Sequence, residues 1–269
     1  MTTNSVNKPF PYTELQRRLA GTRFGGTVHF LETTDSTNTV ALELAEGGAP
    51  EGDLVIADRQ KQGRGRLPGR NWQSPAGRNL YVSAILRPMT NPSKAATLTL
   101  TAGVAVAEAL EAWCPGRVSI KWPNDVNIGG KKVSGILTEM RTRGDSVDFV
   151  VVGIGVNIFM KFDEFDEQFR HRATSLLEET THTLDRVDVA AAVLRSLDRW
   201  YETYSREGFA PVRSRWLDRA GTVNERVTVD DRGSSKKGIV RGIDEEGALL
   251  LEDEAGSVVR ILSGDVLVQ

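Results

Sequence analysis

The chain has 269 residues, and its 34 lysines and arginines against 36 aspartates and glutamates leave a net charge of −2, which argues against a protein that coats nucleic acid. Hydrophobic residues at 39% and charged residues at 26% are typical of a globular protein with a full core. A single cysteine excludes a disulfide framework, and no apolar run reaches the roughly 18–20 residues of a membrane span. The N-terminus lacks the apolar core of a signal peptide, so we expect a cytoplasmic protein.

The first two thirds of the chain predict an α+β fold. Residues 1–26 are expected to form a tail and a short helix over 13–20, and residues 35–38 offer N-cap chemistry for a following helix. Apolar alternation predicts strands, and apolar residues at helical spacing predict two longer helices. The strands are expected at 27–32, 54–58, 79–87, 117–122, 133–140 and 147–158, and the helices at 98–113 and 189–204. Such bunched strands favour a mixed, largely antiparallel sheet with flanking helices.

The pattern changes after about residue 220. Four short strand-like runs follow, at 225–231, 236–244, 248–254 and 258–269. Turns are expected at 231–233, 246–247 and 255–256, where glycines follow polar or small residues. This texture predicts a small β-barrel. We therefore expect a domain over 27–220 and a second one over 221–269.

Residues 59–72 (RQKQGRGRLPGRNW) suit neither a helix nor a strand. Four arginines in this stretch repel one another unless an anion arrives, and its glycines permit close backbone approach. We expect a loop that is mobile when empty and orders around a phosphate or carboxylate. A solvated basic loop or an RNA contact is the alternative. Trp72 could stack on a base, although a lone tryptophan is more often part of a core.

Two further stretches carry polar groups at strand ends. In IKWPNDVN, Pro123 ends a strand beside Lys121, Asn124 and Asp125, and Lys132 opens the next strand in KKVSGILTE. A lysine that works on a transferring phosphoryl group needs a carboxylate to position it, and Asp125 is the candidate. An ordinary surface pair is the alternative. The glycines of VVGIGVN permit close ligand approach, but the stretch lacks the dinucleotide fingerprint.

Together these segments resemble the biotin protein ligases. The matching motifs are DSTN at 35–38, GRGR at 63–66 with Gln60 and Trp72, NLY at 79–81, KWPNDV at 121–126, KKVSGIL at 131–137 and GIGVN at 153–157. The resemblance covers residues 27–269 and implies a class II synthetase-like catalytic domain followed by an SH3-like one. Only about 25 residues precede the first expected strand, too few for a helix-turn-helix, so the sequence is similar to the short form that does not bind DNA.

The resemblance implies two reactions: biotin and ATP give biotinyl-5′-AMP and pyrophosphate, and a lysine of a biotin carboxyl carrier protein then accepts biotin. Lys132, Arg66 and Asp125 are implied as catalytic. Biotin is implied to contact Ser36, Thr37, Asn38, Gln60, Arg64, Gly65, Arg66 and Lys132. ATP and the adenylate are implied to contact Trp72, Lys121, Asn124 and Asn157, with Mg²⁺ held through the phosphates and Asp125 as one candidate ligand. A monomer or weak homodimer, without a membrane partner, is the accompanying expectation.

One departure concerns the loop itself. The family pattern has one residue between the second arginine and the third glycine, whereas here Leu67 and Pro68 fill that gap. The longer loop makes Arg70 and Trp72 less secure correspondences than Arg66.

Two alternatives stay open: a lipoate–protein ligase, which shares the fold and the adenylation of a carboxylic acid, and a non-enzymatic nucleic-acid binder that uses the Arg/Gly loop. The GRGR loop together with KWPND favours biotin over lipoate.

Overall fold

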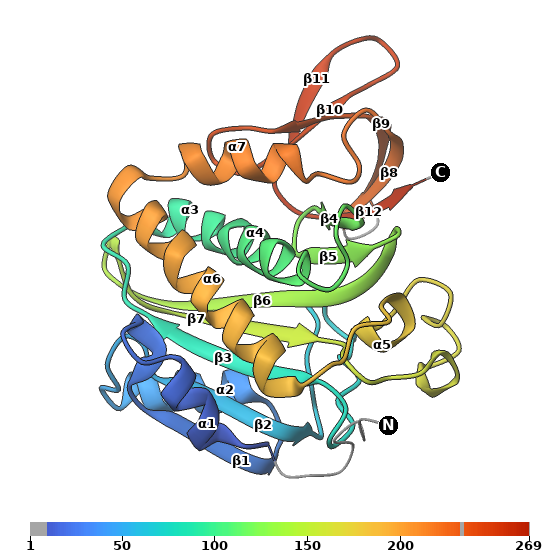
Figure 1. The fold of residues 1–269 in the computed structure, drawn as a ribbon. Helices are drawn as coiled ribbons and strands as arrows, with labels where there is room; N and C mark the ends of the chain where they lie inside the picture. The colour runs from blue at the N-terminus through green and yellow to red at the C-terminus, as the bar shows by residue number, and fades with distance from the viewer. Residues whose placement is uncertain (1–9, 232–233, 269) are drawn as a thin grey trace.

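A large mixed sheet forms the centre of the computed structural model, which describes residues 10–231 and 234–268 (Figure 1). Its strands follow the order β1-β2-β3-β7-β6-β5-β4, and only the β1–β2 pair is parallel among the pairs described. The strands are β1 (Val28–Thr34), β2 (Leu54–Gln60), β3 (Leu80–Leu86), β4 (Val118–Lys121), β5 (Asp125–Ile128), β6 (Lys131–Arg143) and β7 (Ser146–Val156). The predicted α+β class with a mixed, largely antiparallel sheet is confirmed.

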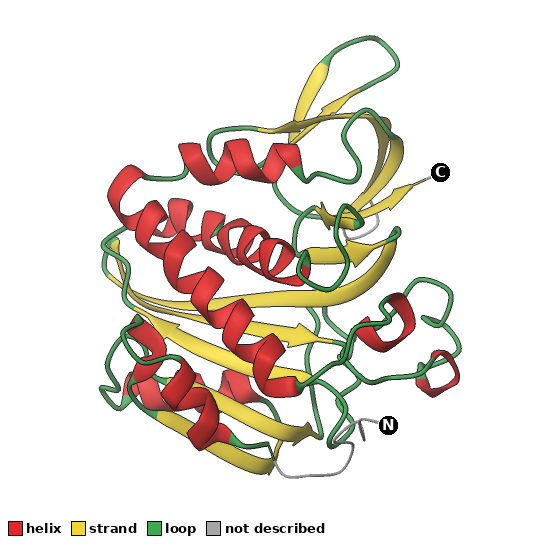
Figure 2. Cartoon of the chain, viewed as in Figure 1, coloured by secondary structure: helices red, strands yellow, loops and turns green. Residues whose placement is uncertain are grey.

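Helices cover both faces of this sheet, unequally (Figure 2). They are α1 (Tyr12–Arg18), α2 (Thr37–Glu46), α3 (Pro92–Ala95), α4 (Thr97–Leu110), α5 (Leu176–Glu179), α6 (Arg186–Glu207) and α7 (Ala210–Asp218), with single 3₁₀ turns η1 (Arg23–Gly25) and η2 (Phe162–Glu164). Helices α1, α4, α6 and α7 share the main apolar core, while α2 packs through Ala41 and Ala45 on Val55 and Ile85 of the opposite face. All seven residues of β3 are buried because layers cover both of its faces.

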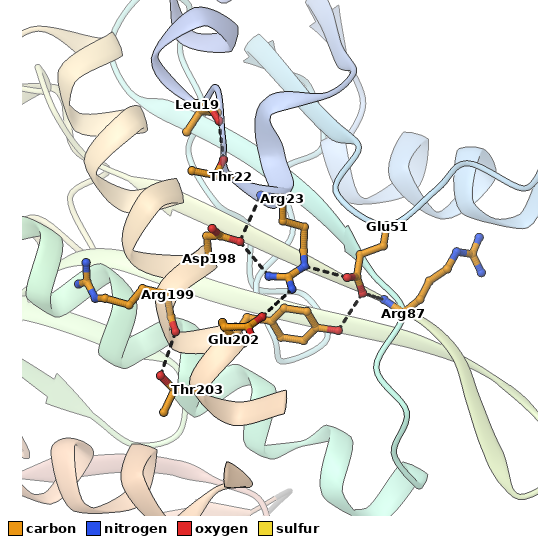
Figure 3. A network of polar contacts seen from close by, with 10 residues as sticks. Leu19, Thr22, Arg23, Glu51, Arg87, Asp198, Arg199, Glu202 and Thr203 are labelled. Atoms are coloured by element: carbon orange, nitrogen blue, oxygen red, sulfur yellow. Dashed lines mark hydrogen bonds and ion pairs between the residues drawn. The ribbon is translucent and has the colours of Figure 1, made fainter. Parts of the chain in front are cut away.

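An ion-pair cluster joins the N-terminal segment to the helical layer (Figure 3). The Arg23 guanidinium donates to Glu51 at 2.8 Å, to Asp198 at 2.8 Å and to Glu202 at 3.1 Å. Glu51 also accepts from the backbone N–H of Arg87 at 2.7 Å. The charge-assisted bonds therefore connect η1, the segment before β2, the end of β3 and α6.

A second sheet follows α7 and lies at one end of the molecule (Figure 1). Its strands, in the antiparallel order β11-β10-β9-β8-β12, are β8 (Arg226–Asp231), β9 (Ser234–Ile243), β10 (Leu249–Glu252), β11 (Val258–Ile261) and β12 (Asp265–Val268). The expectation of one strand over 258–269 is wrong, because the chain turns at Gly264, whose φ is +142°. The two sheets are joined where the Gly221 N–H donates to the Ile120 carbonyl at 2.9 Å and Trp122 Nε1 donates to the Gly247 carbonyl at 3.0 Å.

Several local features depart from the sequence-based expectations. Strand β5 and helix α7 were not predicted, and Pro123, which was expected to end a strand, follows the end of β4 in a tight hairpin turn that leads into β5. Ser36 occupies the N-cap of α2, but its side chain makes no capping hydrogen bond. The tail was expected over 1–12, but Phe10 is buried and α1 already begins at Tyr12, so that expectation is wrong for residues 10–12. The rest of the expected tail, 1–9, and the turn residues 232–233 lie outside the described residues. No helix in the described ranges combines the length and the apolar character needed to cross a membrane.

Candidate active site

The Arg/Gly loop forms a short hairpin over one end of the large sheet. The Gly65 N–H donates to the Arg70 carbonyl at 2.7 Å, and the Trp72 N–H donates to the Gly63 carbonyl at 2.9 Å. Gly63 and Gly65 are required here, because a Cβ on Gly63 would lie 2.4 Å from the Trp72 carbonyl oxygen and one on Gly65 would lie 2.9 Å from Arg70 Cβ. The hairpin also contacts the C-terminal sheet, where Arg66 Nη2 donates to the Gly264 carbonyl at 2.6 Å.

The loop covers a small polar cavity of about 60 Å³. Its lining contains Ser36, Thr37, Asn38, Gln60, Arg64, Gly65, Arg66, Trp72, Asn124 and Lys132, together with Tyr81 and residues of β6 and β7. All eight residues that the resemblance assigns to biotin are therefore gathered around one cavity. The N-terminus of α2, the end of β2, the loop and the start of β6 supply them.

A hydrogen-bonded chain fixes the α2 side of this cavity. Gln60 Oε1 accepts from the Thr37 N–H at 2.9 Å and lies 3.1 Å from the Thr37 hydroxyl. Gln60 Nε2 donates to Ser74 Oγ at 3.0 Å, and that hydroxyl in turn donates to the Trp72 carbonyl at 2.9 Å. Because each amide and hydroxyl has a partner, the Gln60 side chain holds one orientation.

Glycines of β6 and β7 form the floor. Gly135 and Gly155 are paired across the two strands, and the Trp72 ring lies over both. A Cβ on Gly155 would lie 2.6 Å from the ring, and one on Gly153 would lie 2.1 Å from Asn38 Oδ1. The predicted close approach at GIGVN is thus used by the side chains of Trp72 and Asn38.

Beside the small cavity lies a larger one of about 510 Å³. Its lining contains Lys121, Asn124, Asp125, Lys132, Asn157 and Trp72, with Phe165, Phe169 and Arg172 of the segment after β7 and Asp265 to Leu267 of the C-terminal sheet. All four residues that the resemblance assigns to ATP therefore lie around this second cavity. Asn157 is held by its own bond to the Thr174 carbonyl at 3.0 Å, and Asn124 by one to the Ile136 carbonyl at 2.8 Å.

The two cavities share a boundary. Gly65, Arg66, Trp72, Asn124 and Lys132 line both of them. Lys132 Nζ lies 2.6 Å from Asp125 Oδ1 and 5.3 Å from the centre of the Trp72 ring. The expected Lys132–Asp125 pair is present, and it is only partly exposed, with 34% and 16% of the two side chains accessible. The Lys132 ammonium thus lies at the boundary where a molecule bound in the small cavity would meet a molecule bound in the large one.

Tyr81 is a neutral residue of the site whose side chain is also held by a hydrogen bond. Burial raises the pKa of the Tyr81 phenol far above its usual value, so the hydroxyl remains a neutral donor to the Pro75 carbonyl at 3.0 Å. This bond fixes the segment that follows Trp72. Among the described residues, no cluster of three or more histidine, cysteine, aspartate or glutamate side chains could hold a metal ion by itself.

Comparison with known proteins assigns this arrangement. Residues 30–157 match the biotin/lipoate A/B protein ligase family, and residues 222–268 match the biotin protein ligase C-terminal domain. The biotin–[acetyl-CoA-carboxylase] ligase of Paracoccus denitrificans is 39% identical over 232 residues, which cover 85% of this chain and 95% of that protein. The chain belongs to the biotin protein ligase family. The resemblance seen in the sequence is confirmed.

Further biotin protein ligases match most of this chain. The bifunctional ligase/repressor BirA of Bacillus spizizenii is 37% identical over 263 residues, 97% of this chain and 80% of that protein. A solved biotin protein ligase from Aquifex aeolicus, in complex with biotin and ATP, superposes with a TM-score of 0.76 at 33% identity and covers 90% of this chain and 98% of its own. The C-terminal match and these relatives place the chain with the biotin protein ligases rather than with the lipoate ligases.

Several residues of the site were not identified from the sequence. Ser83 lies on a fully buried strand and places its hydroxyl 2.8 Å from Thr37 Oγ1 and 2.6 Å from Asn38 Oδ1. Glu139, on β6, contacts both Asn38 and Arg64. The only sequence feature that could have indicated Ser83 is its hydroxyl within an apolar strand, because a buried hydroxyl needs a hydrogen-bond partner. Glu139 carried no signal, because its partners lie 75 and 101 residues away along the chain.

Proposed function

We propose that this biotin protein ligase activates biotin with ATP and transfers it to a lysine of a biotin carboxyl carrier domain. One observation carries the proposal: the two cavities meet at Lys132 and Arg66. Biotin occupies the small cavity, with its carboxylate toward the boundary, and ATP occupies the larger one. The two anions then approach each other where Lys132 and Arg66 supply positive charge.

In the first step a biotin carboxylate oxygen attacks the α-phosphorus of ATP. A P–O bond forms, the bond to the β-phosphate bridging oxygen breaks, and pyrophosphate leaves. Lys132 and Arg66 offset the repulsion between carboxylate and phosphate and stabilise the charge that builds on the α-phosphate oxygens. Asp125, 2.6 Å from Lys132 Nζ, keeps the ammonium directed at the boundary instead of toward solvent.

Magnesium fits this site as a companion of the nucleotide. Mg²⁺ commonly keeps several waters and binds through one or two carboxylates plus substrate phosphates. Asp125 is a carboxylate in the lining of the larger cavity, and the described residues contain no acidic cluster that could form a cage of its own. When bound with ATP, the ion neutralises phosphate charge. Asp125 is the residue that would hold it, directly or through water.

In the second step the amine of a carrier lysine attacks the acyl carbon of biotinyl-5′-AMP. An amide bond forms, the acyl–phosphate bond breaks, AMP leaves, and the amine loses a proton. Lys132 and Arg66 stabilise the negative charge of the departing phosphate. The carboxylate of Asp125 lies beside Lys132 and can accept the proton through its second oxygen.

The loop controls entry and protects the intermediate. The hairpin covers the small cavity, so we expect it to move outward, carrying Trp72, when biotin enters and to settle around the bound molecule afterwards. Its return excludes water, which would otherwise hydrolyse the mixed anhydride. Phe165 and Phe169 also line the larger cavity and are, with Trp72 of the loop, the aromatic side chains that could stack on the adenine.

The decisive experiment supplies the protein with a carrier domain, ATP and magnesium, and with either biotin or lipoate. We expect biotin-dependent pyrophosphate release and labelling of the carrier lysine, detected by mass spectrometry. Labelling with lipoate but not with biotin would replace the proposal with a lipoate ligase. A Lys→Arg carrier is the control, because it removes the acceptor amine and leaves pyrophosphate release in place.

A further inference from the structure

Glu139 joins two parts of the biotin cavity that are distant in the sequence. It lies near the middle of β6 and points toward the loop and α2. Its Oε2 accepts from Asn38 Nδ2 at 2.8 Å and from Arg64 Nη2 at 2.8 Å. One carboxylate oxygen therefore connects the N-terminal turn of α2 with Arg64 of the loop.

The amide of Asn38 is fully committed on the α2 side. Its Nδ2 donates to the Leu137 carbonyl at 3.1 Å as well as to Glu139, which uses both hydrogens. Its Oδ1 lies 2.6 Å from the Ser83 hydroxyl, directly above Gly153. Asn38 is 3% exposed, so it cannot turn toward biotin without leaving a buried group without its partner. Asn38 therefore holds the Glu139 carboxylate in place.

The Arg64 side of this junction is different, because it can open. The Arg64 side chain is 43% exposed and the Glu139 side chain 29%, and an isolated ion pair of that exposure is weak. The fixed carboxylate strengthens it, since only the arginine loses freedom when the pair forms. The two partners thus make a contact that is stable enough to favour the closed loop and weak enough to release it.

The loop has a second attachment that does not depend on Glu139. Arg66 donates to the Gly264 carbonyl at 2.6 Å, and Arg70 lies 3.6 Å from Asp265, both on the C-terminal sheet. Removal of the Glu139 carboxylate would free the side of the hairpin that covers the small cavity and leave the other side attached. A molecule bound in the small cavity should therefore dissociate faster, whereas the larger cavity should change little.

We infer that Glu139 is a positioning residue that latches the loop through Arg64 and thereby sets the lifetime of enzyme-bound biotinyl-5′-AMP. The inference rests on the proposed function. Glu139 acts through Arg64 and Asn38, because it does not line either cavity. It therefore controls how long the closed state lasts, while Lys132 and Arg66 carry the chemistry.

The test compares Glu139→Ala and Glu139→Gln with the wild-type full chain. Biotinyl-5′-AMP is formed on the enzyme from biotin, ATP and magnesium, and its dissociation rate is followed after dilution into excess unlabelled biotin. We expect dissociation to be about 5- to 20-fold faster for Glu139→Ala, the range of one weak to moderate charged hydrogen bond. Glu139→Gln should fall in between, because an amide oxygen can still accept from Asn38. Rates equal to wild type in both variants would refute the inference.

Glu46→Ala provides a matched control. Glu46 forms an α2–β6 ion pair, to Arg141 at 2.9 Å, with both side chains 52% exposed, and neither residue lines either cavity. It should leave the dissociation rate unchanged, and a rate that rises as much as in Glu139→Ala would show a general effect of loosening α2. Thermal unfolding of each variant separates loss of fold from loss of the latch.

A double-mutant cycle with Arg64→Ala decides the route. If Glu139 acts through Arg64, Glu139→Ala adds less than twofold to the dissociation rate of Arg64→Ala. Full additivity would overturn the latch. Failure of the wild-type protein to form biotinyl-5′-AMP would instead remove the proposed function, so the two failures can be told apart.

Discussion

Gly155→Ala tests whether the floor of the site positions Trp72. The added Cβ would lie 2.6 Å from Cε2 and Nε1 of the indole and 2.9 Å from Cζ2. Carbon atoms in contact prefer separations of about 3.5–4.0 Å, so the ring must withdraw by roughly 1 Å. Strand β7 is paired on both sides and cannot yield, whereas the loop that carries Trp72 can.

The displacement should reduce activity far more than stability. The Trp72 carbonyl accepts from Ser74, which in turn orients Gln60, and the Trp72 ring lies 5.3 Å from Lys132 Nζ. A misplacement of about 1 Å in a site can cost on the order of 100-fold in rate, and we expect kcat/KM for biotin-dependent pyrophosphate release to fall by about 10- to 100-fold. Overpacking that a loop can relieve should cost about 1 kcal/mol, or roughly 2–4 °C in Tm.

Steady-state pyrophosphate release and a thermal scan measure the two quantities. Gly103→Ala is the control, because it makes the same change in α4, where the new methyl would meet only Ile120 Cγ2 at 3.6 Å. That variant should keep full activity and gain a few tenths of a kcal/mol from helix propensity. Normal kcat/KM in Gly155→Ala would show that the position of Trp72 does not matter to the chemistry. It would refute the claim that Gly155 sets the activity by leaving room for the Trp72 ring.

Three further predictions concern charge. Lys132→Ala should lower pyrophosphate release by about 100-fold or more with the circular dichroism spectrum unchanged, and near-normal release would contradict its role. Arg66→Ala should speed biotinyl-5′-AMP dissociation by about tenfold, and an unchanged rate would remove Arg66 from loop closure. Burial raises the pKa of Glu108, but bonds from Trp200 and Arg215 outweigh it and lower the pKa below 4.5, so the stability they supply is lost as pH falls through the folded-state pKa. Glu108→Gln should therefore flatten the loss of unfolding free energy below about pH 4.5 in denaturant titrations.

The sequence predicted the parts of the fold that repeat a strong local pattern. Strands β2, β3 and β7 are apolar runs buried on both faces, and α4 and α6 carry long apolar stripes, so periodicity located all five. Strand β5 has four residues, too few for a period to be recognised, and α7 follows α6 after only Gly208 and Phe209. These two elements depend on tertiary packing, which local propensity does not report.

The sequence motifs predicted which residues line the site, but they did not predict the hydrogen-bond partners that fix those side chains. Lys132 and Asp125 are near in sequence and lie on paired strands, so their contact could be anticipated. The partners of Asn38 could not, because Ser83 and Glu139 reach it only through the strand order β3-β7-β6. Side-chain networks across nonconsecutive strands depend on register, and register is fixed by the whole core.

Three arginines of the loop have acceptors within the protein itself. From the sequence, the clustered guanidinium groups were expected to repel one another until an external anion arrived. Instead Arg64 pairs with Glu139, Arg66 binds the Gly264 carbonyl, and Arg70 faces Asp265. A phosphate or carboxylate ligand must therefore compete with acceptors that the protein already supplies, and part of its binding energy is offset by their release. Such competition lowers ligand affinity but preorganises the hairpin, which is why closure can be controlled by a carboxylate that never touches the substrate.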